Sequence, residues 1–255
     1  MKRSARPVSW LTAGEEFPAL NQAWSADDAA PGLLAAGGAL DVNSLVRAYS
    51  AGIFPWFSLG QPILWWSPDP RMVLLTAEFK LHRSLKKSLQ RFLKSPTCSV
   101  TFDTAFDQVI AACANAPRDG QSGTWIVPDM IAAYSQLHQA GHAHSIETWV
   151  NGELIGGLYC VNLGGMVFGE SMFARQTDAS KIALSALVAF CKAKDIRMID
   201  CQQNTQHLSS FGAREISRES FVAHVSQQSS RVNPEWVFEA HHWNEIMSTQ
   251  TEPLL

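Results

Sequence analysis

The chain has 255 residues, of which 46% are hydrophobic and 17% are charged, and its formal net charge is −3. This composition excludes an extensively disordered chain and provides enough apolar side chains for one large domain or two unequal ones. The net charge argues against a protein that binds nucleic acid over its whole surface, although it says nothing about local concentrations of positive charge.

The cysteines and the apolar segments indicate the cellular compartment. The five cysteines include no Cys-x-x-Cys pair, which favours reduced thiols over a disulfide framework or a zinc site. No apolar stretch reaches the length of a membrane span, and no apolar segment of a signal peptide follows the basic residues near the N-terminus. We therefore expect a cytoplasmic protein.

Residues 1–76 are predicted to form a small N-terminal α/β domain. Its first 40 residues lack a clear hydrophobic period and are expected to be loops. A short helix is predicted at residues 41–50, with Asp41 as its cap and Tyr49 among the side chains of its apolar face.

The segment from Phe54 to Trp66 combines five aromatic side chains with prolines that exclude a regular helix. Such a segment suits a platform on which nucleobases or a side chain stack. The alternative is a packing seam between two domains, and composition alone favours that alternative.

Residues 80–94 are predicted to form an amphipathic helix with leucines and Phe92 on one face. The opposite face carries positive charge without any acidic residue, whereas an ordinary solvated face usually mixes both signs. We expect this face to contact the phosphate backbone of RNA. Its basic residues are Arg83, Lys86, Lys87, Arg91 and Lys94, and Lys80 is a further basic residue of the segment.

Residues 77–255 are predicted to form an α+β domain with a mixed, largely antiparallel sheet. Two tight turns, at Asn151-Gly152 and Gly164-Gly165, join three antiparallel strands in series. The expected strands are 97–102, 144–150, 154–161, 166–173 and 197–202. The expected helices are 103–114 (capped by Asp103), 129–140 (opened by Pro128), a buried helix at 179–194 (capped by Asp178), and one that begins at 217 or 218.

Three histidines, His138, His142 and His144, lie close together in the sequence. A metal site is conceivable, but Gly141 separates the first histidine from the other two, and no third ligand of certain direction is nearby. Structural or hydrogen-bonding histidines are favoured, and no metal is expected.

Three polar residues at the ends of apolar strands are candidates for chemistry. Glu170 follows an apolar strand beside a glycine, where it is either a site residue or a structural residue in a salt bridge. Asp200 and Gln202 alternate with apolar residues and project from one face of a strand. A carboxylate and an amide in this arrangement can accept a proton and orient a nucleophile.

Seven motifs, taken together, resemble the bacterial leucyl/phenylalanyl-tRNA–protein transferase family. The resemblance covers about residues 30–220, and seven motifs in the same order are very specific. They are Gly-Ile-Phe-Pro-Trp-Phe (52–57), Ile-Leu-Trp-Trp-Ser-Pro-Asp-Pro-Arg (63–71), Gly-Thr-Trp-Ile (123–126), Gly-His-Ala-His-Ser-Ile-Glu (141–147), Gly-Glu-Ser-Met-Phe (169–173), Ala-Ser-Lys (179–181) and Ile-Asp-Cys-Gln (199–202).

The resemblance implies a small N-terminal domain followed by an acyltransferase domain of the GNAT kind. It implies transfer of Leu or Phe, less often Met, from aminoacyl-tRNA to proteins that begin with Arg or Lys, which marks them for degradation in the N-end rule pathway. No cofactor and no metal are implied, because the aminoacyl ester is already activated. We expect a monomer that does not bind membranes.

The resemblance also implies roles for individual residues. Asp200 with Gln202 would draw a proton from the attacking amine or orient that amine, and Glu170 would face positive charge of the acceptor. Trp56 and Trp125 would lie near the terminal adenosine or the pocket wall. Arg83, Lys86, Lys87 and Arg91 would contact the tRNA. A pocket for the Leu or Phe side chain would include Leu158, Val167, Phe168, Leu184, Leu187 and Ile199.

The chain departs from the family pattern at Val167 and Leu187, where we expect Phe in family members. The smaller side chains would widen the pocket and favour Phe, unless the neighbouring Phe168 compensates. An acyltransferase of the same fold that uses a CoA thioester is an alternative, but residues 176–180 lack the glycines of a pyrophosphate loop. A binding module that has lost its chemistry is a further alternative, against which the presence of Glu170, Asp200 and Gln202 argues.

Overall fold

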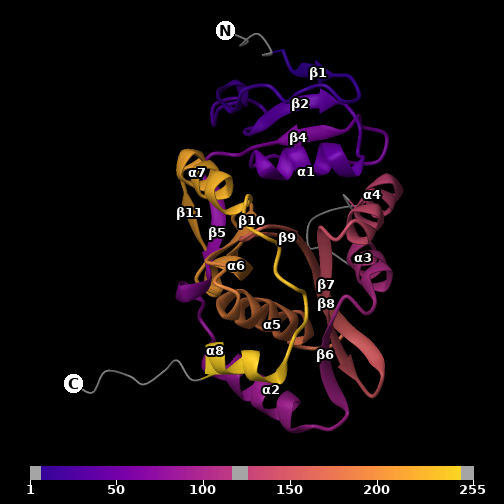
Figure 1. The fold of residues 1–255 in the computed structure, drawn as a ribbon, viewed down its shortest axis with the longest axis vertical. Helices are drawn as coiled ribbons and strands as arrows, with labels where there is room; N and C mark the ends of the chain where they lie inside the picture. Colours follow the sequence, from indigo (N-terminus) through magenta and orange to yellow (C-terminus); the bar gives the residue numbers. More distant parts are fainter. Residues whose placement is uncertain (1–6, 117–125, 248–255) are drawn as a thin grey trace, which may run out of the picture.

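The computed structural model describes residues 7–116 and 126–247, which form two β-sheets of different size (Figure 1). The smaller sheet has the strand order β1-β2-β4-β3. Helix α1 (Val42–Ser50) packs between this sheet and the rest of the molecule. The strands are β1 (Ser9–Leu11), β2 (Leu33–Gly37), β3 (Phe54–Pro55) and β4 (Leu64–Trp66), and a 3-10 turn, η1 (Leu20–Gln22), lies between β1 and β2.

The larger sheet has seven strands in the order β11-β5-β10-β9-β8-β7-β6. Of its neighbouring pairs, β9 and β10 are parallel and the others are antiparallel. This mixed, largely antiparallel sheet confirms the predicted α+β class. Its strands are β5 (Arg71–Leu75), β6 (Cys98–Phe102), β7 (Ala143–Val150), β8 (Glu153–Leu163), β9 (Met166–Ala174), β10 (Met198–Gln202) and β11 (Arg214–Ile216).

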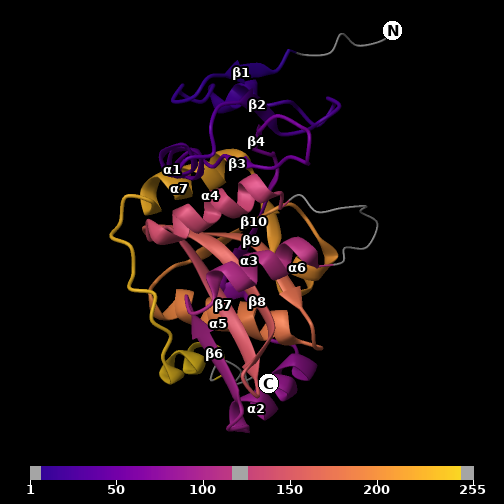
Figure 2. The same cartoon turned by 90° about the vertical axis from the view of Figure 1, so that its right-hand side faces the viewer.

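Helices cover both faces of the larger sheet (Figure 2). Helices α3 (Phe106–Asn115) and α4 (Pro128–Gln139) pack on one face, and α5 (Ala179–Ala193) lies across the other. Helix α2 (Arg83–Lys94) lies at the end of the sheet away from α1 (Figure 1). The remaining elements are the 3-10 turns η2 (Thr76–Glu78) and η3 (Ala240–Trp243) and the helices α6 (Gln206–Ser210), α7 (Arg218–Gln228) and α8 (Asn244–Met247).

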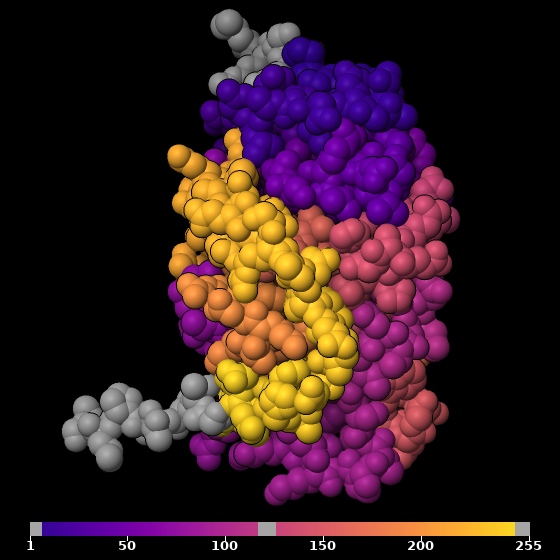
Figure 3. Space-filling model, in the orientation of Figure 1, coloured from indigo at the N-terminus to yellow at the C-terminus, as the bar shows by residue number. Residues whose placement is uncertain are grey.

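The segment that follows α7 crosses the face on which α5 lies, and Figure 3 shows it running down to α8. Trp236 of this segment stacks on His144, with the ring centroids 4.0 Å apart, and also contacts Phe190 of α5. Helix α5 is therefore enclosed between the sheet and this segment, which confirms that it is largely buried. None of the helices in the described ranges is long and apolar enough to cross a membrane.

Several local predictions are confirmed by the structure. The carboxylate of Asp41 accepts a hydrogen bond from the backbone N–H of Ser44 at 2.8 Å and so caps α1. Pro128 is the first residue of α4, where its missing N–H costs nothing. Asn151 and Gly152 have positive φ angles of 52° and 77°, as a two-residue hairpin turn requires.

Other local predictions were wrong. Strands β1 and β2 occupy part of residues 1–40, which we expected to be loops, because three to five residues give too short a period to recognise. Helix α2 begins at Arg83 rather than Lys80, and Leu93 is 41% exposed. Asp103 does not cap α3, because its carboxylate accepts hydrogen bonds from Ser145 N–H and the His144 ring instead.

The chain passes from the smaller to the larger sheet between Trp66 and Arg71. Strand β5 therefore pairs within the larger sheet, ahead of the predicted boundary between residues 76 and 77. The division into domains 1–76 and 77–255 stays a prediction.

Candidate active site at the divergence of two parallel strands

The candidate active site lies where the parallel strands β9 and β10 separate. Their register contains two residue pairs, Ile199 with Val167 and Asp200 with Phe168. Beyond them β10 ends at Gln202, and a bulge interrupts its pairing with β5 between Asp200 and Gln202. Gln202 adopts a φ angle of +59°, which is uncommon for a residue other than glycine. The bulge redirects the Gln202 side chain at the end of the strand.

A buried ion pair between Arg71 and Asp200 lies beside this divergence. The guanidinium donates through Nε to Oδ1 at 2.8 Å and through Nη2 to Oδ2 at 2.7 Å. Both residues are 0% exposed. The guanidinium also lies between the rings of Phe54 and Phe221, at 4.7 and 4.5 Å from their centroids.

Asp200 also accepts a hydrogen bond from the backbone N–H of Gln202, at 2.9 Å to Oδ1. The carboxylate thus holds Arg71 with both oxygens and the main chain of Gln202 with one of them. Both oxygens of this carboxylate are therefore engaged by donors of the protein. It is better placed to fix Gln202 than to take up a proton.

Glu170 is buried beside this pair and accepts hydrogen bonds from three side chains. The Tyr49 hydroxyl of α1 donates to Oε1 at 2.7 Å, and the Tyr134 hydroxyl of α4 donates to Oε2 at 3.1 Å. The amide nitrogen of Gln202 donates to Oε1 at 2.9 Å. Residues from α1, α4, β9 and β10 therefore meet at one carboxyl group.

The two tyrosine hydroxyls also hydrogen-bond to each other. Tyr49, Tyr134 and Glu170 thus form a ring of three O···O contacts, whereas the two hydroxyls supply only two protons. A third proton, carried by the Glu170 carboxyl, satisfies all three contacts. The group of three side chains can therefore hold either two or three protons.

Burial raises the pKa of Glu170 to about 7, and the negative charge of Asp200 acts in the same direction, while the hydrogen bonds from Tyr49, Tyr134 and Gln202 oppose the rise. The pKa values of Tyr49 and Tyr134 are raised well above 10, first by burial and then by the neighbouring Glu170. Glu170 can therefore gain or lose a proton near neutral pH, whereas both tyrosines stay protonated.

The structure brings Glu170, Asp200 and Gln202 together, but it divides the predicted apolar pocket between the two faces of the sheet. Phe168 packs on the Tyr49 side, with ring centroids 5.0 Å apart. The other five side chains lie between the opposite face of the sheet and α5, with exposures of 0–4%; they are Leu158, Val167 and Ile199 of the sheet and Leu184 and Leu187 of α5. Phe168 faces away from the other five side chains because it follows Val167 in a strand.

Strands β9 and β10 still lie close together just beyond their paired residues. Gly169 lies here, and a Cβ atom on it would be 3.3 Å from the backbone oxygen of Asp200 and 3.8 Å from the side chain of Ile199. Met172 and Cys201 pack against the apolar cluster and are partly exposed. The aliphatic cluster thus reaches the surface near the end of β10, close to Gln202.

The remaining predicted residues lie elsewhere. Trp56 follows β3, and its ring packs edge-on against Trp66 at 5.4 Å. Trp125 lies outside the described residues. Arg83, Lys87 and Arg91 are exposed on α2, whereas Lys86 is half-buried.

Among the three histidines, His138 and His144 have hydrogen-bonding partners, whereas the buried Nδ1 of His142 has none within the described residues. His138 donates from Nδ1 to the carbonyl oxygen of Ala143 at 2.8 Å, and His144 Nδ1 lies 2.7 Å from a carboxylate oxygen of Asp103. Within the ranges 7–116 and 126–247, no group of three or more His, Cys, Asp or Glu residues is arranged to hold a metal ion. These contacts favour the structural interpretation.

Sequence reasoning missed three residues of the site. The helical pattern places Tyr49 on an inward face without linking it to Glu170, and Arg71 ends one of the seven motifs without a role. No sequence signal distinguishes Tyr134. A buried carboxylate requires partners, so Glu170 and Asp200 could have prompted a search for them, but the sequence does not show which residues are near in space.

Comparison with known proteins places the chain in one family. The family model of the leucyl/phenylalanyl-tRNA protein transferase matches residues 73–226, and the model of the N-terminal domain of the same transferase matches residues 38–69. A leucyl/phenylalanyl-tRNA–protein transferase from Polaromonas sp. (strain JS666) is 65% identical over 254 residues, covering 100% of both chains. The protein of that name from Albidiferax ferrireducens is 56% identical, covering 98% of this chain and 99% of its own.

Solved structures resemble the chain more distantly. A GCN5-related N-acetyltransferase from Kribbella flavida has a TM-score of 0.34 at 6% identity, covering 65% of this chain and 57% of its own. L-PGS from Bacillus licheniformis has a TM-score of 0.37 at 12% identity, covering 73% of this chain and 62% of its own. Neither likeness is close enough to indicate a function.

The pKa of Glu170 predicts a pH-dependent stability that a Glu170→Gln variant should lack. The folded protein binds the carboxyl proton more tightly than an unfolded chain, where the pKa is 4.5, so this group lowers the free energy of unfolding as the pH rises from 4.5 to about 7. Glutamine mimics the protonated carboxyl. Urea unfolding should show the two proteins similar at pH 4 and the variant more stable by about 3 kcal/mol at pH 8.5. A difference that does not change with pH would contradict the raised pKa.

The ion pair between Arg71 and Asp200 predicts strong coupling in unfolding experiments. Arg71→Met and Asp200→Asn each leave a buried charge without its partner and should lower the free energy of unfolding by about 3–5 kcal/mol. The double variant leaves no isolated charge, so its destabilisation should be well below the sum of the two single effects. Additive effects in a double-mutant cycle would show that the pair is not coupled in this way.

Proposed function

The chain belongs to the family of leucyl/phenylalanyl-tRNA–protein transferases, and on this premise we propose that it transfers Leu or Phe, less often Met, from aminoacyl-tRNA to proteins that begin with Arg or Lys. The product is a degradation signal of the N-end rule pathway. The aminoacyl ester is an activated acyl donor, so the reaction needs a positioned, neutral amine rather than a cofactor. The observation that supports this proposal most strongly is the buried Glu170 with Gln202 at the end of β10.

Glu170 is suited to take up the proton that the attacking amine must lose. An N-terminal amine has a pKa of about 7.7–8.0, so most of it is protonated at neutral pH. A carboxyl with a pKa of about 7 is ionised in a large fraction of molecules at that pH and can accept this proton. A positive charge on the acceptor would favour the ionised form further.

Gln202 would orient the amine. Its amide nitrogen is engaged by Glu170, which leaves its carbonyl oxygen as the acceptor for an N–H of the amine. Asp200 would act through Gln202 as a positioning residue, because its oxygens hold Arg71 and the Gln202 main chain. This supports the orienting role of the Asp200–Gln202 pair over direct proton transfer to Asp200.

The reaction is balanced without another reactant. The amine nitrogen attacks the ester carbonyl carbon, a C–N bond forms, and the bond from that carbon to the ribose oxygen breaks. The protonated amine first gives one proton to the ionised Glu170, which releases it to solvent. As the neutral amine attacks, the nitrogen loses its second proton, and the leaving ribose oxygen takes up this proton directly or through water.

The aliphatic cluster under α5 is proposed to receive the Leu or Phe side chain. The cluster reaches the surface near Met172, on the side where β9 and β10 diverge. Its side chains are closely packed, so binding requires them to move apart. Val167 and Leu187 leave more room than Phe would at these positions, which suits a large side chain.

A CoA thioester is a less suitable donor for this site. Asp178 occupies the N-cap position of α5, but its side chain does not cap the helix as predicted, because its carboxylate accepts hydrogen bonds from Ser88 at 2.8 Å and Lys181 at 2.9 Å. A carboxylate at this position repels the pyrophosphate that a helix N-terminus would otherwise attract.

Transfer activity is the direct test of the proposal. Purified protein should move labelled Leu from Leu-tRNA, and labelled Phe from Phe-tRNA, to a peptide that begins with Arg. The matched peptide that begins with Ala should receive neither. Transfer to both peptides would refute the acceptor specificity, and transfer to neither with both tRNAs would refute the proposed activity.

The exposed face of α2 should bind tRNA by neutralising its phosphates. Lys87→Gln combined with Arg91→Gln should weaken binding and make its logarithmic dependence on salt shallower, by roughly 0.7–0.9 for each phosphate that is no longer neutralised. Arg47→Gln is the control, because it removes the same kind of charge from α1, at the other end of the molecule. Fluorescence anisotropy with labelled tRNA at several salt concentrations measures both effects, and an unchanged slope would mean that this face is only solvated.

A further inference from the structure

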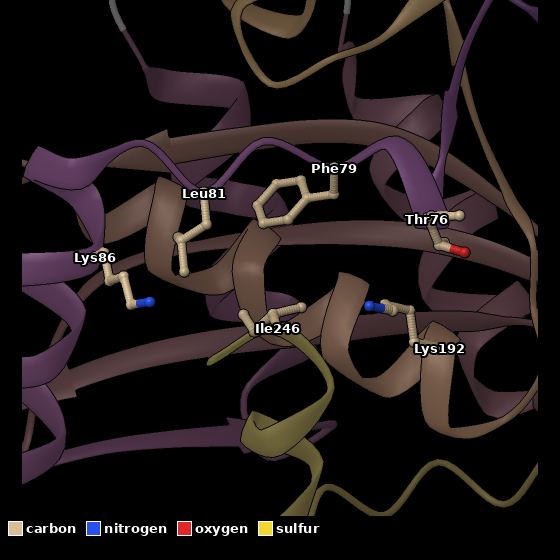
Figure 4. A pocket seen from close by; sticks show the side chains of 7 residues that line it. Thr76, Phe79, Leu81, Lys86, Lys192 and Ile246 are labelled. Carbon is tan, nitrogen blue, oxygen red and sulfur yellow. The ribbon is translucent and has the colours of Figure 1, made fainter. Parts of the chain in front are cut away.

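A cavity of about 120 Å³ lies between η2, α2, α5 and α8 (Figure 4). The cavity is remote from Glu170. Strand β5 begins at Arg71, in the candidate site, and the cavity lies beyond the other end of this strand, at Thr76. Its volume is about four times the share of one water molecule in the liquid, so it accommodates a group of a few heavy atoms. The lining residues are Thr76, Ala77, Phe79, Leu81, Lys86, Lys192 and Ile246.

Two lysines from different helices converge on this cavity. Figure 4 shows the ammonium groups of Lys86, from α2, and Lys192, from α5, directed into it from opposite sides. Lys192 is held in this direction by donating from Nζ to the backbone oxygen of Glu245 at 2.5 Å. None of the lining residues is acidic. The carboxylate of Glu78, next to the lining residues in the chain, is engaged by Arg214 at 3.0 Å.

The walls make this arrangement favourable for an anion. Phe79, Leu81 and Ile246 present apolar surface, and a charge beside apolar walls interacts more strongly than the same charge in open water. Two ammonium groups that face one cavity repel each other, and an anion between them replaces this repulsion with two attractions. Each ammonium group has three donors, so Lys192 can bind an oxyanion without releasing Glu245.

We propose that this cavity binds a phosphate group, and that the phosphate belongs to the backbone of the tRNA. This source rests on the proposed function. It is favoured over free phosphate because Lys86 lies on the same helix as the exposed Arg83, Lys87 and Arg91, at the border of their basic face. An RNA strand that runs along this face can place one phosphate between Lys86 and Lys192. The neighbouring phosphates of the strand would then contact the exposed Arg83, Lys87 and Arg91.

The test measures binding of uncharged tRNA, so that it does not depend on transfer activity. Lys192→Gln should lower the affinity for tRNA. It should also make the salt dependence of binding shallower by the contribution of about one phosphate, so that the ratio of the affinities of the unaltered protein and the variant changes about threefold between 50 and 200 mM salt. Lys194→Gln is the matched control, because Lys194 follows α5 and does not line the cavity. Circular dichroism checks that both variants are folded.

A double variant sharpens the test. Lys86 and Lys192 are proposed to share one phosphate, so Lys86→Gln with Lys192→Gln should change the salt dependence little more than either single variant. Equal binding by Lys192→Gln, Lys194→Gln and the unaltered protein would overturn the site. Inorganic phosphate that binds in a Lys192-dependent way, as measured by calorimetry, without any effect of Lys192→Gln on tRNA binding would overturn the RNA source.

The site and the proposed function fail separately. Binding of tRNA that depends on Lys192, in a protein that transfers no amino acid, would uphold the site and remove the function. Normal transfer by a protein whose tRNA binding does not depend on Lys192 would uphold the function and remove the site.

Discussion

The buried ion pair between Arg71 and Asp200 is the constraint on which the candidate site depends. Arg71 is the first residue of β5, and its guanidinium lies between Phe54 of the smaller sheet and Phe221 of α7. Through Asp200 it fixes the main chain of Gln202. A buried ion pair costs much of its attraction in lost hydration, so its contribution to stability alone is small compared with an apolar pair. The ion pair instead fixes positions in the site. It connects both sheets to Gln202, the side chain at the end of β10 that donates a hydrogen bond to Glu170.

Glu170 shows how burial and hydrogen bonding together set a chemical property. Burial alone would favour the neutral carboxyl, and three donors alone would favour the carboxylate. Because burial outweighs the three hydrogen bonds, the pKa of Glu170 is raised from its ordinary value, but these bonds limit the rise to about 7. The two tyrosines also help Glu170 to change its protonation state, because the three hydrogen-bond contacts among Tyr49, Tyr134 and Glu170 can accommodate one further proton. An enzyme that must accept a proton from an N-terminal amine requires a group of this kind.

Elements with strong local signals could be predicted from the sequence. The cap at Asp41, the proline at the start of α4 and the turn at Asn151-Gly152 act within a few residues, so their chemistry is visible in the chain itself. The predicted cap at Asp103 was wrong because the partners that engage its carboxylate are 41 and 42 residues away. The site was predicted in part for the same reason: Glu170, Asp200 and Gln202 are conspicuous as polar residues in apolar strands, whereas Tyr49, Tyr134 and Arg71 gain their roles only from tertiary contacts.

The division of the predicted pocket follows from the topology of the sheet. Strands β9 and β10 are parallel, so the chain must cross over between them, and the crossing element is α5. This helix covers one face and collects the aliphatic side chains, which leaves Phe168 and Glu170 on the other. An amino acid ester that used both sets would need to lie in the gap between the two strands, with its side chain toward α5 and its carbonyl group toward Gln202. The backbone pairing of β9 and β10 ends after two residue pairs, so an ester at this place would not have to break further ladder hydrogen bonds between the two strands.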